Sequence, residues 1–316
     1  MGNVDDFESR YPGLGDTLEE LVGANHVRRA ESMAAHTTFK VGGPADLFVE
    51  PQTTAQLIHV LRACREVEAP SFLLGLGSDL LVGDGGFRGV MVACPAGLAG
   101  IEVSGARITC QPGAALADVS RAAADHGLTG LEFACGIPGS VGGAVFMNAG
   151  AYDGCVADVL ASATLLDQDG EAFDLPAADL ELGYRTSRVR TQGLAVLSAT
   201  FVLEPGDETA IRAKMADLTA RREEKQPLEL PSAGSTFKRP QGHFAGKLIT
   251  DAGLKGYQVG GAAVSTKHAG FVVNLGGASA ADVRAVIAHV QAEVRRQFGV
   301  DLEPEVRFVG EFDGAR

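Results

Sequence analysis

Long apolar segments are missing from this 316-residue chain. No run approaches the roughly 18 apolar residues that mark a membrane span. Residues 1–10 are acidic and lack the basic and apolar regions of a signal peptide. The cysteines form no CxxC pair and no zinc-site spacing, and their odd number favours reduced thiols: Cys64, Cys94, Cys110, Cys135 and Cys155. We therefore expect a cytoplasmic protein with no membrane partner, and we expect it to act as a monomer.

Several sequence signatures of large functional classes are also missing. His36, His243 and His268 form no HxxxH or HExxH pattern, so no catalytic metal is expected. There is no GxSxG elbow, no GxGxxG dinucleotide fingerprint and no P-loop. The formal net charge of −13 argues against nucleic acid as a partner. A bound anion would need a local exception to this charge.

Glycine is abundant, with 41 residues, and it clusters at 75–89, 136–154 and 253–277. The segment from Gly75 to Val82 follows a predicted strand. It is either an ordinary tight turn or a turn whose free amides hold a pyrophosphate. Residues 136–152 carry side chains that look too small to build a core. They favour a backbone that passes close to a flat or phosphorylated ligand.

Periodicity predicts an α+β protein of two or three domains. Residues 1–35 are expected to form a short helix and an exposed tail, and 38–50 a strand interrupted at 42–44. Ser279 and Gly299 have the residue types of an N-terminal and a C-terminal cap, and an apolar stripe ending at Phe298 lies between them. The remaining predictions are helices at 54–67, 114–126, 208–225 and 279–299, strands at 72–74, 89–93, 158–167 and 194–204, and a hairpin at 100–111.

Polar residues that could carry chemistry are Tyr184, Arg185, the run 232–240 and Glu305. Taken singly, each is more simply explained as a surface or turn residue. Between 221 and 255 there are seven basic residues against four acidic ones, in contrast to the rest of the chain. Lys238, Arg239 and Lys247 flank glycines and prolines, which favours loop contacts to an anion. Arg221 and Arg222 read more simply as a solvated helix face.

Several of these segments, in this order, resemble the UDP-N-acetylenolpyruvoylglucosamine reductase family. The resemblance extends over roughly residues 25–310, and no single segment decides it. The matching segments are Thr37-Thr38-Phe39-Lys40-Val41-Gly42-Gly43-Pro44-Ala45, 75–89, 136–152, Tyr184-Arg185, Gly234-Ser235-Thr236-Phe237-Lys238, 245–276 and Leu302-Glu303-Pro304-Glu305-Val306-Arg307.

The resemblance implies an FAD-binding domain of the vanillyl-alcohol-oxidase type, built of two α+β subdomains, and a C-terminal α+β substrate domain. After a 1–35 N-terminal extension, residues 36–205 would bind FAD (subdomains about 36–93 and 94–205), residues 206–302 would bind substrate, and the tail 303–316 would return to the flavin. The FAD would lie between the first two glycine clusters. The implied cofactor-binding residues are Gly75, Gly77, Ser78, Asp79, Leu80, Gly136, Ile137, Pro138, Gly139, Ser140, Gly142, Gly143, Ala144, Asn148, Ala149 and Gly150.

The resemblance further implies reduction of UDP-N-acetylglucosamine enolpyruvate to UDP-N-acetylmuramate, a step of peptidoglycan synthesis, with non-covalent FAD and NADPH as hydride donor. Ser235 matches the family's proton donor, and Arg185 and Glu305 match its other catalytic positions. Arg185 would meet charge on the substrate carboxylate, and Glu305 would be protonated or would bridge to a cation. Tyr184, Lys225 and Lys238 are the implied substrate contacts.

One departure from part of the family concerns the segment after Arg185. Some members insert a tyrosine lid there, whereas this chain runs almost directly to the next predicted strand, so it resembles the shorter, lid-lacking branch. Two other functions remain open from the residues. One is an oxygen-using sugar or lactone oxidase with flavin attached through Cys135 or Cys155. The other is a flavin- or nucleotide-binding regulator without turnover.

Overall fold

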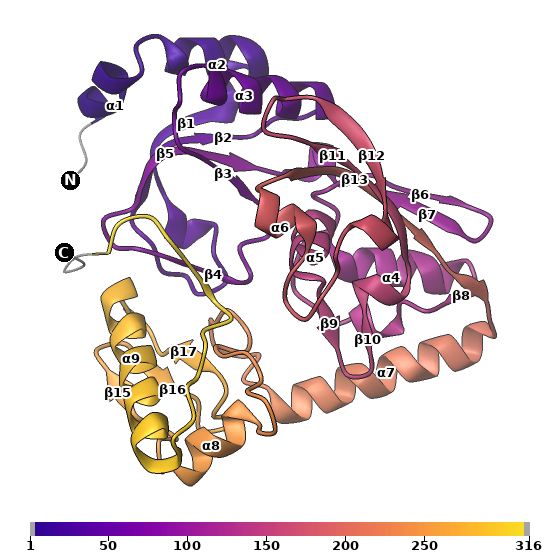
Figure 1. Cartoon of the computed structure of the whole chain (residues 1–316), viewed down its shortest axis with the longest axis vertical. Helices are drawn as coiled ribbons and strands as arrows, with labels where there is room; N and C mark the ends of the chain where they lie inside the picture. Colours follow the sequence, from indigo (N-terminus) through magenta and orange to yellow (C-terminus); the bar gives the residue numbers. More distant parts are fainter. Residues whose placement is uncertain (1–3, 313–316) are drawn as a thin grey trace.

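The computed structural model describes residues 4–312, and it consists of an upper part with two large sheets and a smaller lower lobe (Figure 1). The first sheet has the strand order β1-β2-β5-β3, with β1 antiparallel and the others parallel. Helices α1, α2 and α3 cover one face of this sheet. The bounds are α1 (Val4–Arg10), α2 (Leu14–Val22), β1 (Val27–Ser32), β2 (Pro44–Val49), α3 (Thr54–Glu66), β3 (Ser71–Leu74) and β5 (Phe87–Ala93).

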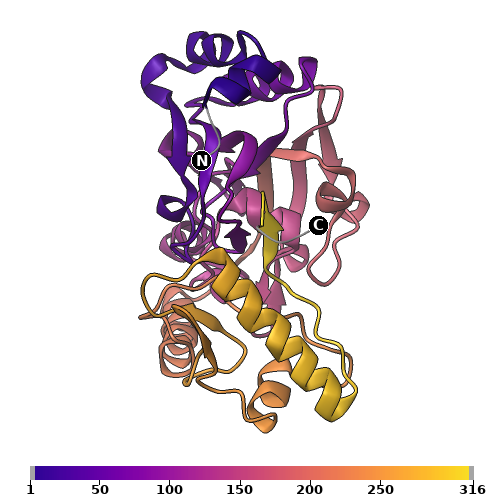
Figure 2. The same ribbon diagram turned by 90° about the vertical axis from the view of Figure 1, so that its left-hand side faces the viewer.

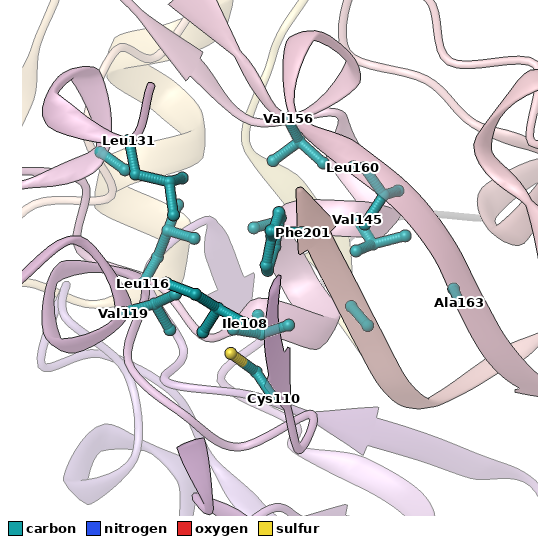
Figure 3. Close-up of a cluster of buried hydrophobic side chains, with 14 of the residues drawn as sticks. Ile108, Cys110, Leu116, Val119, Leu131, Val145, Val156, Leu160, Ala163 and Phe201 are labelled. Atoms are coloured by element: carbon teal, nitrogen blue, oxygen red, sulfur yellow. The ribbon is translucent and has the colours of Figure 1, made fainter. Parts of the chain in front are cut away.

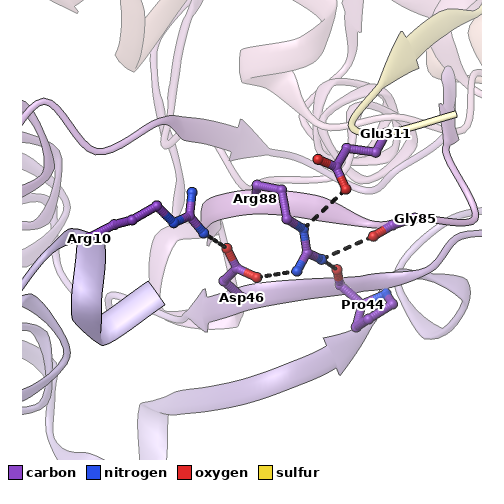
Figure 4. A network of polar contacts seen from close by, with 6 residues as sticks. All are labelled: Arg10, Pro44, Asp46, Gly85, Arg88 and Glu311. Atoms are coloured by element: carbon purple, nitrogen blue, oxygen red, sulfur yellow. Dashed lines mark hydrogen bonds and ion pairs between the residues drawn. The ribbon is translucent and has the colours of Figure 1, made fainter. Parts of the chain in front are cut away.

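The N-terminal region differs from the predicted short helix and exposed tail. It contributes two helices to the core, where Phe7 and Leu18 are fully buried, and the edge strand β1. Arg10 on α1 bonds to Asp46 on β2, and Arg88 on β5 bonds to the same carboxylate at 2.5 Å (Figure 4). Residues 4–32 are therefore an integral part of the first subdomain. The predicted strand at 38–50 is also shorter, because the chain before Pro44 is a loop.

The second sheet is antiparallel throughout, with the order β12-β11-β13-β7-β6. Helices α4 and α5 pack on it, and Phe201 is buried near the middle of the resulting core (Figure 3). The short α6 follows the loop at Arg185. The bounds are β6 (Ile101–Ser104), β7 (Arg107–Cys110), α4 (Leu116–Asp125), β8 (Leu128–Thr129), α5 (Val141–Met147), β9 (Gly150–Ala151), β10 (Gly154–Cys155), β11 (Leu160–Leu166), β12 (Ala172–Pro176), α6 (Arg188–Gln192), β13 (Ala195–Val202) and β14 (Glu204–Pro205).

The long helix α7 leads from the second sheet to the lower lobe, where α9 covers the sheet β15-β16-β17 (Figures 1 and 2). Ser279 and Asp282 form the predicted capping box of α9, and Gly299 ends the helix in the left-handed region at φ 69°. The residues of the predicted apolar stripe are buried, except for Phe298, which is 39% exposed. The bounds are α7 (Glu208–Lys225), α8 (Ala245–Asp251), β15 (Gln258–Val259), β16 (Ala262–Val264), β17 (Val272–Asn274) and α9 (Ala280–Phe298).

The end of the chain returns from the lower lobe to the upper part (Figure 2). There β18 (Arg307–Val309) pairs in parallel with β4 (Leu80–Val82), the strand that follows the first glycine turn. This pairing places the residues just before β18 beside the segment that begins at Gly75. Within residues 4–312, none of the helices combines the length and apolar character that crossing a bilayer requires.

Candidate active site

The first two glycine clusters lie directly against each other. A Cβ added at Gly75 would come within 2.2 Å of the Ser140 hydroxyl oxygen, and one added at Gly139 would come within 3.3 Å of the Ser78 hydroxyl. Ser140 is buried and caps α5 by accepting a hydrogen bond from Gly143 N at 3.3 Å. The two backbones can approach this closely because neither glycine carries a side chain. They form what we call the glycine cradle, residues 75–79 and 139–143.

The glycine cradle does not include all of the predicted cofactor residues. Gly136 faces Arg222 of α7, since an added Cβ would meet the Arg222 Cδ at 2.9 Å. Arg222 is half-buried and its pKa is lowered by burial, whereas a solvated place on the helix face was predicted. The prediction that the side chains of residues 136–152 are too small to build a core is wrong, because Ile137, Ala144 and Ala149 pack in the core of the second sheet.

Asn148 and Gly150 hold the loop that carries Arg185. Asn148 lies in the left-handed region at φ 43°, and its side-chain amide donates to Gly183 O at 3.0 Å. Its side-chain oxygen accepts from Ala157 N at 2.9 Å. Gly150 O accepts a hydrogen bond from Arg185 Nη2 at 3.2 Å. These contacts give both residues a role in positioning Arg185.

Arg185 and Glu305 meet in a half-buried ion pair although 120 residues separate them. Arg185 Nε donates to Glu305 Oε1 at 2.5 Å, and the two side chains are 20% and 14% exposed. Burial raises the pKa of Glu305, while Arg185 and Lys238 oppose that shift. Arg185 has a φ of 56°, a strained conformation for a residue with a Cβ. Of the two predicted states of Glu305, the structure shows the bridge to a cation.

The segment that carries Ser235 runs alongside the segment that carries Glu305. The chain segments 235–238 and 303–305 run antiparallel, because Glu305 N donates to Thr236 O at 2.9 Å and Lys238 N donates to Glu303 O at 2.9 Å. Thr236 is buried and fixed to the lower lobe through Gly270 O and Val272 N. Ser235 itself is exposed, and its hydroxyl makes no hydrogen bond within the described part of the chain. The hydroxyl is therefore free to meet a ligand.

Asp79 and Arg307 complete the charged surroundings of Glu305. Arg307 N donates to Asp79 O at 3.0 Å. The Arg307 guanidinium lies over the rings of Phe146 and Phe72, at 4.4 and 5.1 Å from their centroids. Burial, and then the charge of Glu305, raise the pKa of Asp79 to about 8. Arg307 was part of a matching segment, but its sequence gave no reason to assign it a role.

A cavity of about 520 Å³ opens next to the Ser235 segment. Tyr184 and Lys238 line it, as does Arg239, which was predicted to be a loop contact to an anion. His243 also lines the cavity and was not among the predicted site residues. The Tyr184 hydroxyl accepts a hydrogen bond from Arg239 N at 3.1 Å. Asp301 and Glu303 also line the cavity, and Glu303 bonds to Lys238. The negative charges of Asp301 and Glu303 therefore balance the positive charges of Lys238 and Arg239.

Two other predicted basic contacts lie elsewhere. Lys225 is exposed at the end of α7 and is not part of the cavity lining. Lys247 forms an ion pair with Asp251 one turn away on α8, so the prediction of a loop contact to an anion is wrong. Among residues 4–312, no group of three or more His, Cys, Asp or Glu side chains is arranged to hold a metal ion.

The two cysteines near the second glycine cluster have protein contacts. Cys135 lies within 3.6 Å of Met215 O on α7. Cys155 begins a short turn closed by Asp158, whose carboxylate accepts from Cys155 N at 2.7 Å. Burial is the largest cause that raises the pKa of the Cys155 thiol, which opposes its use as a thiolate nucleophile.

The two-sheet upper part and the glycine cradle define a class of protein, the FAD-binding oxidoreductases. A family model described as "FAD binding domain" matches residues 45–176. A second family model matches residues 226–309, and its description is "UDP-N-acetylenolpyruvoylglucosamine reductase, C-terminal domain". The predicted α+β fold with an FAD-binding domain is confirmed.

Curated relatives define the family. UDP-N-acetylenolpyruvoylglucosamine reductase from Clostridium perfringens is 55% identical over 96% of this chain and 99% of its own. The enzyme of that name from Clostridium beijerinckii is 53% identical over 95% and 99%. The crystal structure of the Thermus caldophilus reductase matches with a TM-score of 0.78 and 34% identity, over 90% of this chain and 99% of that one. The chain belongs to the UDP-N-acetylenolpyruvoylglucosamine reductase family, as the resemblance implied.

Proposed function

We propose that the chain reduces UDP-N-acetylglucosamine enolpyruvate to UDP-N-acetylmuramate, with FAD as its cofactor and NADPH as the reductant. Family membership supports this activity. The observation that supports it at the level of residues is the Arg185–Glu305 pair, whose Glu305 segment pairs with the segment that carries the exposed Ser235. In the described part of the chain, α6 is the single helix between Arg185 and β13, which agrees with the lid-lacking branch.

The glycine cradle suits a flavin dinucleotide. Its backbones approach so closely that a methyl group at Gly75 would collide with Ser140, and the buried Asp79 Oδ2 has no hydrogen-bond partner in the described structure. Free backbone amides and an unpaired polar atom are what a polar, flat ligand needs. We propose that the cradle residues Gly75, Gly77, Ser78, Asp79, Gly139 and Ser140 hold FAD, which when bound supplies the hydride chemistry.

Arg185, Ser235 and Glu305 would share the work on the substrate. Reduction of the enolpyruvyl double bond places negative charge on the conjugated carboxylate, and the forked Arg185 guanidinium stabilises that charge. The Ser235 hydroxyl delivers a proton to C2. Glu305 accepts from Arg185 Nε and fixes the direction of the guanidinium. The distribution of roles follows from the free hydroxyl of Ser235 and the paired state of Glu305.

The cavity next to Ser235 is the proposed site for the nucleotide sugar. Tyr184 and Lys238 line it, in agreement with their predicted role. A diphosphate would take the place of Glu303 as the partner of Lys238. The distant position of Lys225 gives its proposed substrate contact no support in this conformation.

The domain division belongs to the proposal as well. The separate lower lobe that follows α7 agrees with a substrate-binding domain at residues 206–302. The β4–β18 pair agrees with a tail that returns to the flavin. We further infer that the protein is a cytoplasmic monomer.

An anaerobic titration tests this function. NADPH should bleach the visible flavin absorbance, and UDP-N-acetylglucosamine enolpyruvate should restore it in a 1:1 ratio. Mild acid should release all of the FAD, because the proposal requires a non-covalent cofactor. Reduction by NADPH without reoxidation by the sugar nucleotide would contradict the proposed substrate, and flavin that stays with the precipitated protein would support the oxidase alternative.

A further inference from the structure

Arg185 lies in a tight turn whose backbone conformation suits glycine better than arginine. Gly183 and Thr186 exchange two backbone hydrogen bonds, of 3.0 and 3.3 Å, and enclose the two turn residues. Arg185 is the second of these two, and its φ of 56° lies in the region where turns usually have glycine or asparagine. The turn alone therefore does not favour an arginine here, and contacts from outside the turn must hold its backbone.

Arg190 supplies such a contact through the carbonyl group of Arg185. The half-buried Arg190 side chain donates from Nη1 to Arg185 O at 2.6 Å, and the same Nη1 lies 3.9 Å from Met147 Sδ on α5. A hydrogen bond from a charged donor is stronger than one between neutral groups. This bond fixes the peptide group that follows Arg185 and thereby limits rotation of the turn.

The backbone of Arg190 is itself fixed to the core of the second sheet. Ser187 is buried, accepts from Arg190 N at 3.3 Å and donates to Phe146 O at 2.8 Å. Val189 is buried in the same core. Because α6 has only five residues, these contacts and not its own hydrogen bonds hold it in place. Arg190 therefore reaches Arg185 from a rigid support.

The direction of the Arg185 side chain depends on the turn that Arg190 holds. Arg185 Nε donates to Glu305 at 2.5 Å, and Nη2 donates to Gly150 O at 3.2 Å. The two acceptors belong to different chain segments, so only one direction of the guanidinium reaches both. Since the Cα–Cβ bond turns with the backbone, a relaxed turn would move the guanidinium away from both acceptors together.

We propose that Arg190 is a positioning residue of the reaction. By its bond to Arg185 O it holds Arg185 in the left-handed conformation from which the forked guanidinium meets the substrate carboxylate. Arg190 acts through Arg185 and does not itself touch the substrate. The inference rests on the proposed function for the role of Arg185, whereas the contact between the two arginines concerns this chain alone.

Anaerobic stopped flow of Arg190→Met tests the role in the reaction. The variant removes the donor and keeps an unbranched stem. At saturating sugar nucleotide, reoxidation of the flavin should slow by roughly 10–10²-fold, the effect of a misplaced group at the reacting centre. Reduction by NADPH should stay near the wild-type rate. Arg190→Lys keeps a charged donor and should recover most of the reoxidation rate.

Arg188→Met is the matched control, because Arg188 lies on the same short helix and its side chain bonds to Gln192. It should change neither half-reaction. Unchanged reoxidation in Arg190→Met, or equal slowing of both half-reactions, would overturn the proposal.

A double variant shows whether Arg190 acts through Arg185. In an Arg185→Ala background the turn no longer directs a guanidinium, so Arg190→Met should slow reoxidation by no more than about twofold further. A full further loss would mean that Arg190 acts on the substrate or on the fold independently of Arg185, and the proposal would fail.

A crystal structure of FAD-bound Arg190→Met decides the contact without substrate. The Arg185 guanidinium should lose its position beside Glu305 and Gly150 O. An unchanged turn with the ion pair intact would overturn the proposal. If the sugar nucleotide reoxidised the flavin of neither the wild-type enzyme nor the variant, the proposed function would fail, and this structure would still decide whether Arg190 holds Arg185.

Discussion

Arg185 and Glu305 show what single residues can reveal in a sequence and what they cannot. Each was a candidate because a known family carries these types at these places, and each alone was better explained as a surface residue. Their contact depends on chain segments 120 residues apart, so spacing could not predict it. Asp79 was expected to bind cofactor, and its contact with Arg307 N depends on a segment that arrives from the end of the chain. His243 lines the cavity although no motif marked it in the sequence.

Arg185→Lys tests the forked contact at the scale of one side chain. A lysine cannot replace both the Nε bond to Glu305 and the Nη2 bond to Gly150, so the charge on the substrate carboxylate loses a fixed donor. We expect kcat to fall by roughly 10²–10³-fold, the usual effect of removing one such donor. Arg188→Lys is the matched control, because Arg188 lies three residues later, at the start of α6, and its side chain bonds to Gln192. Equal losses in both variants would contradict the role of Arg185.

Helix α9 illustrates which elements local sequence can predict. Its capping box, apolar stripe and terminal glycine all lie within 279–299, and the structure matches the prediction closely. The edge strand β1 was missed because its sequence is polar and its partner is β2, so the pairing is not local. The pairing of β18 with β4 joins residues more than 200 positions apart, and no pattern in either segment announces it.

The contact between the two halves of the glycine cradle gives a prediction at the scale of elements. Gly75→Ala should weaken FAD binding strongly, because its Cβ would lie 2.2 Å from the Ser140 hydroxyl oxygen. Ser140→Gly removes that oxygen and retains a tolerable N-cap, which should cost only a few tenths of a kcal/mol. In the double variant we therefore expect much of the FAD affinity lost in Gly75→Ala to return. Fluorescence titration of the apoprotein with FAD measures all three, and additive losses would show that the clash is not the cause.

Three contacts tie the lower lobe to the upper part of the molecule. The Asp84 carboxylate accepts from Ala280 N and Ala281 N at the start of α9, both at 2.8 Å. Thr38 Oγ1 donates to Ser232 O at 2.7 Å, and Asn274 Nδ2 donates to Phe39 O at 3.0 Å. Together they fix the lobe that carries Ser235 relative to the glycine cradle.

Asp84→Ala should loosen this connection. It removes two charge-assisted hydrogen bonds at a helix N-terminus, which costs about 1–2 kcal/mol of the free energy of unfolding. Ser279→Ala removes a cap of the same helix within the lobe and should cost about 1 kcal/mol. Because Asp84, unlike Ser279, joins the lobe to the upper part, we expect the KM for the sugar nucleotide to rise several-fold in Asp84→Ala alone. Urea unfolding and steady-state kinetics give both quantities. A similar KM increase in Ser279→Ala would show that helix stability is responsible.

The most direct measurement separates the two half-reactions of Ser235→Ala by anaerobic stopped flow. Reduction of the flavin by NADPH needs no proton from Ser235, so its rate should stay near that of the wild-type enzyme. Reoxidation by the enolpyruvyl substrate should fall by at least roughly 10²–10⁴-fold, the effect of a lost general acid. Ser232→Ala, three residues earlier in the same segment, should change neither rate. Normal reoxidation in Ser235→Ala, or equal damage to both half-reactions, would contradict the proposed site.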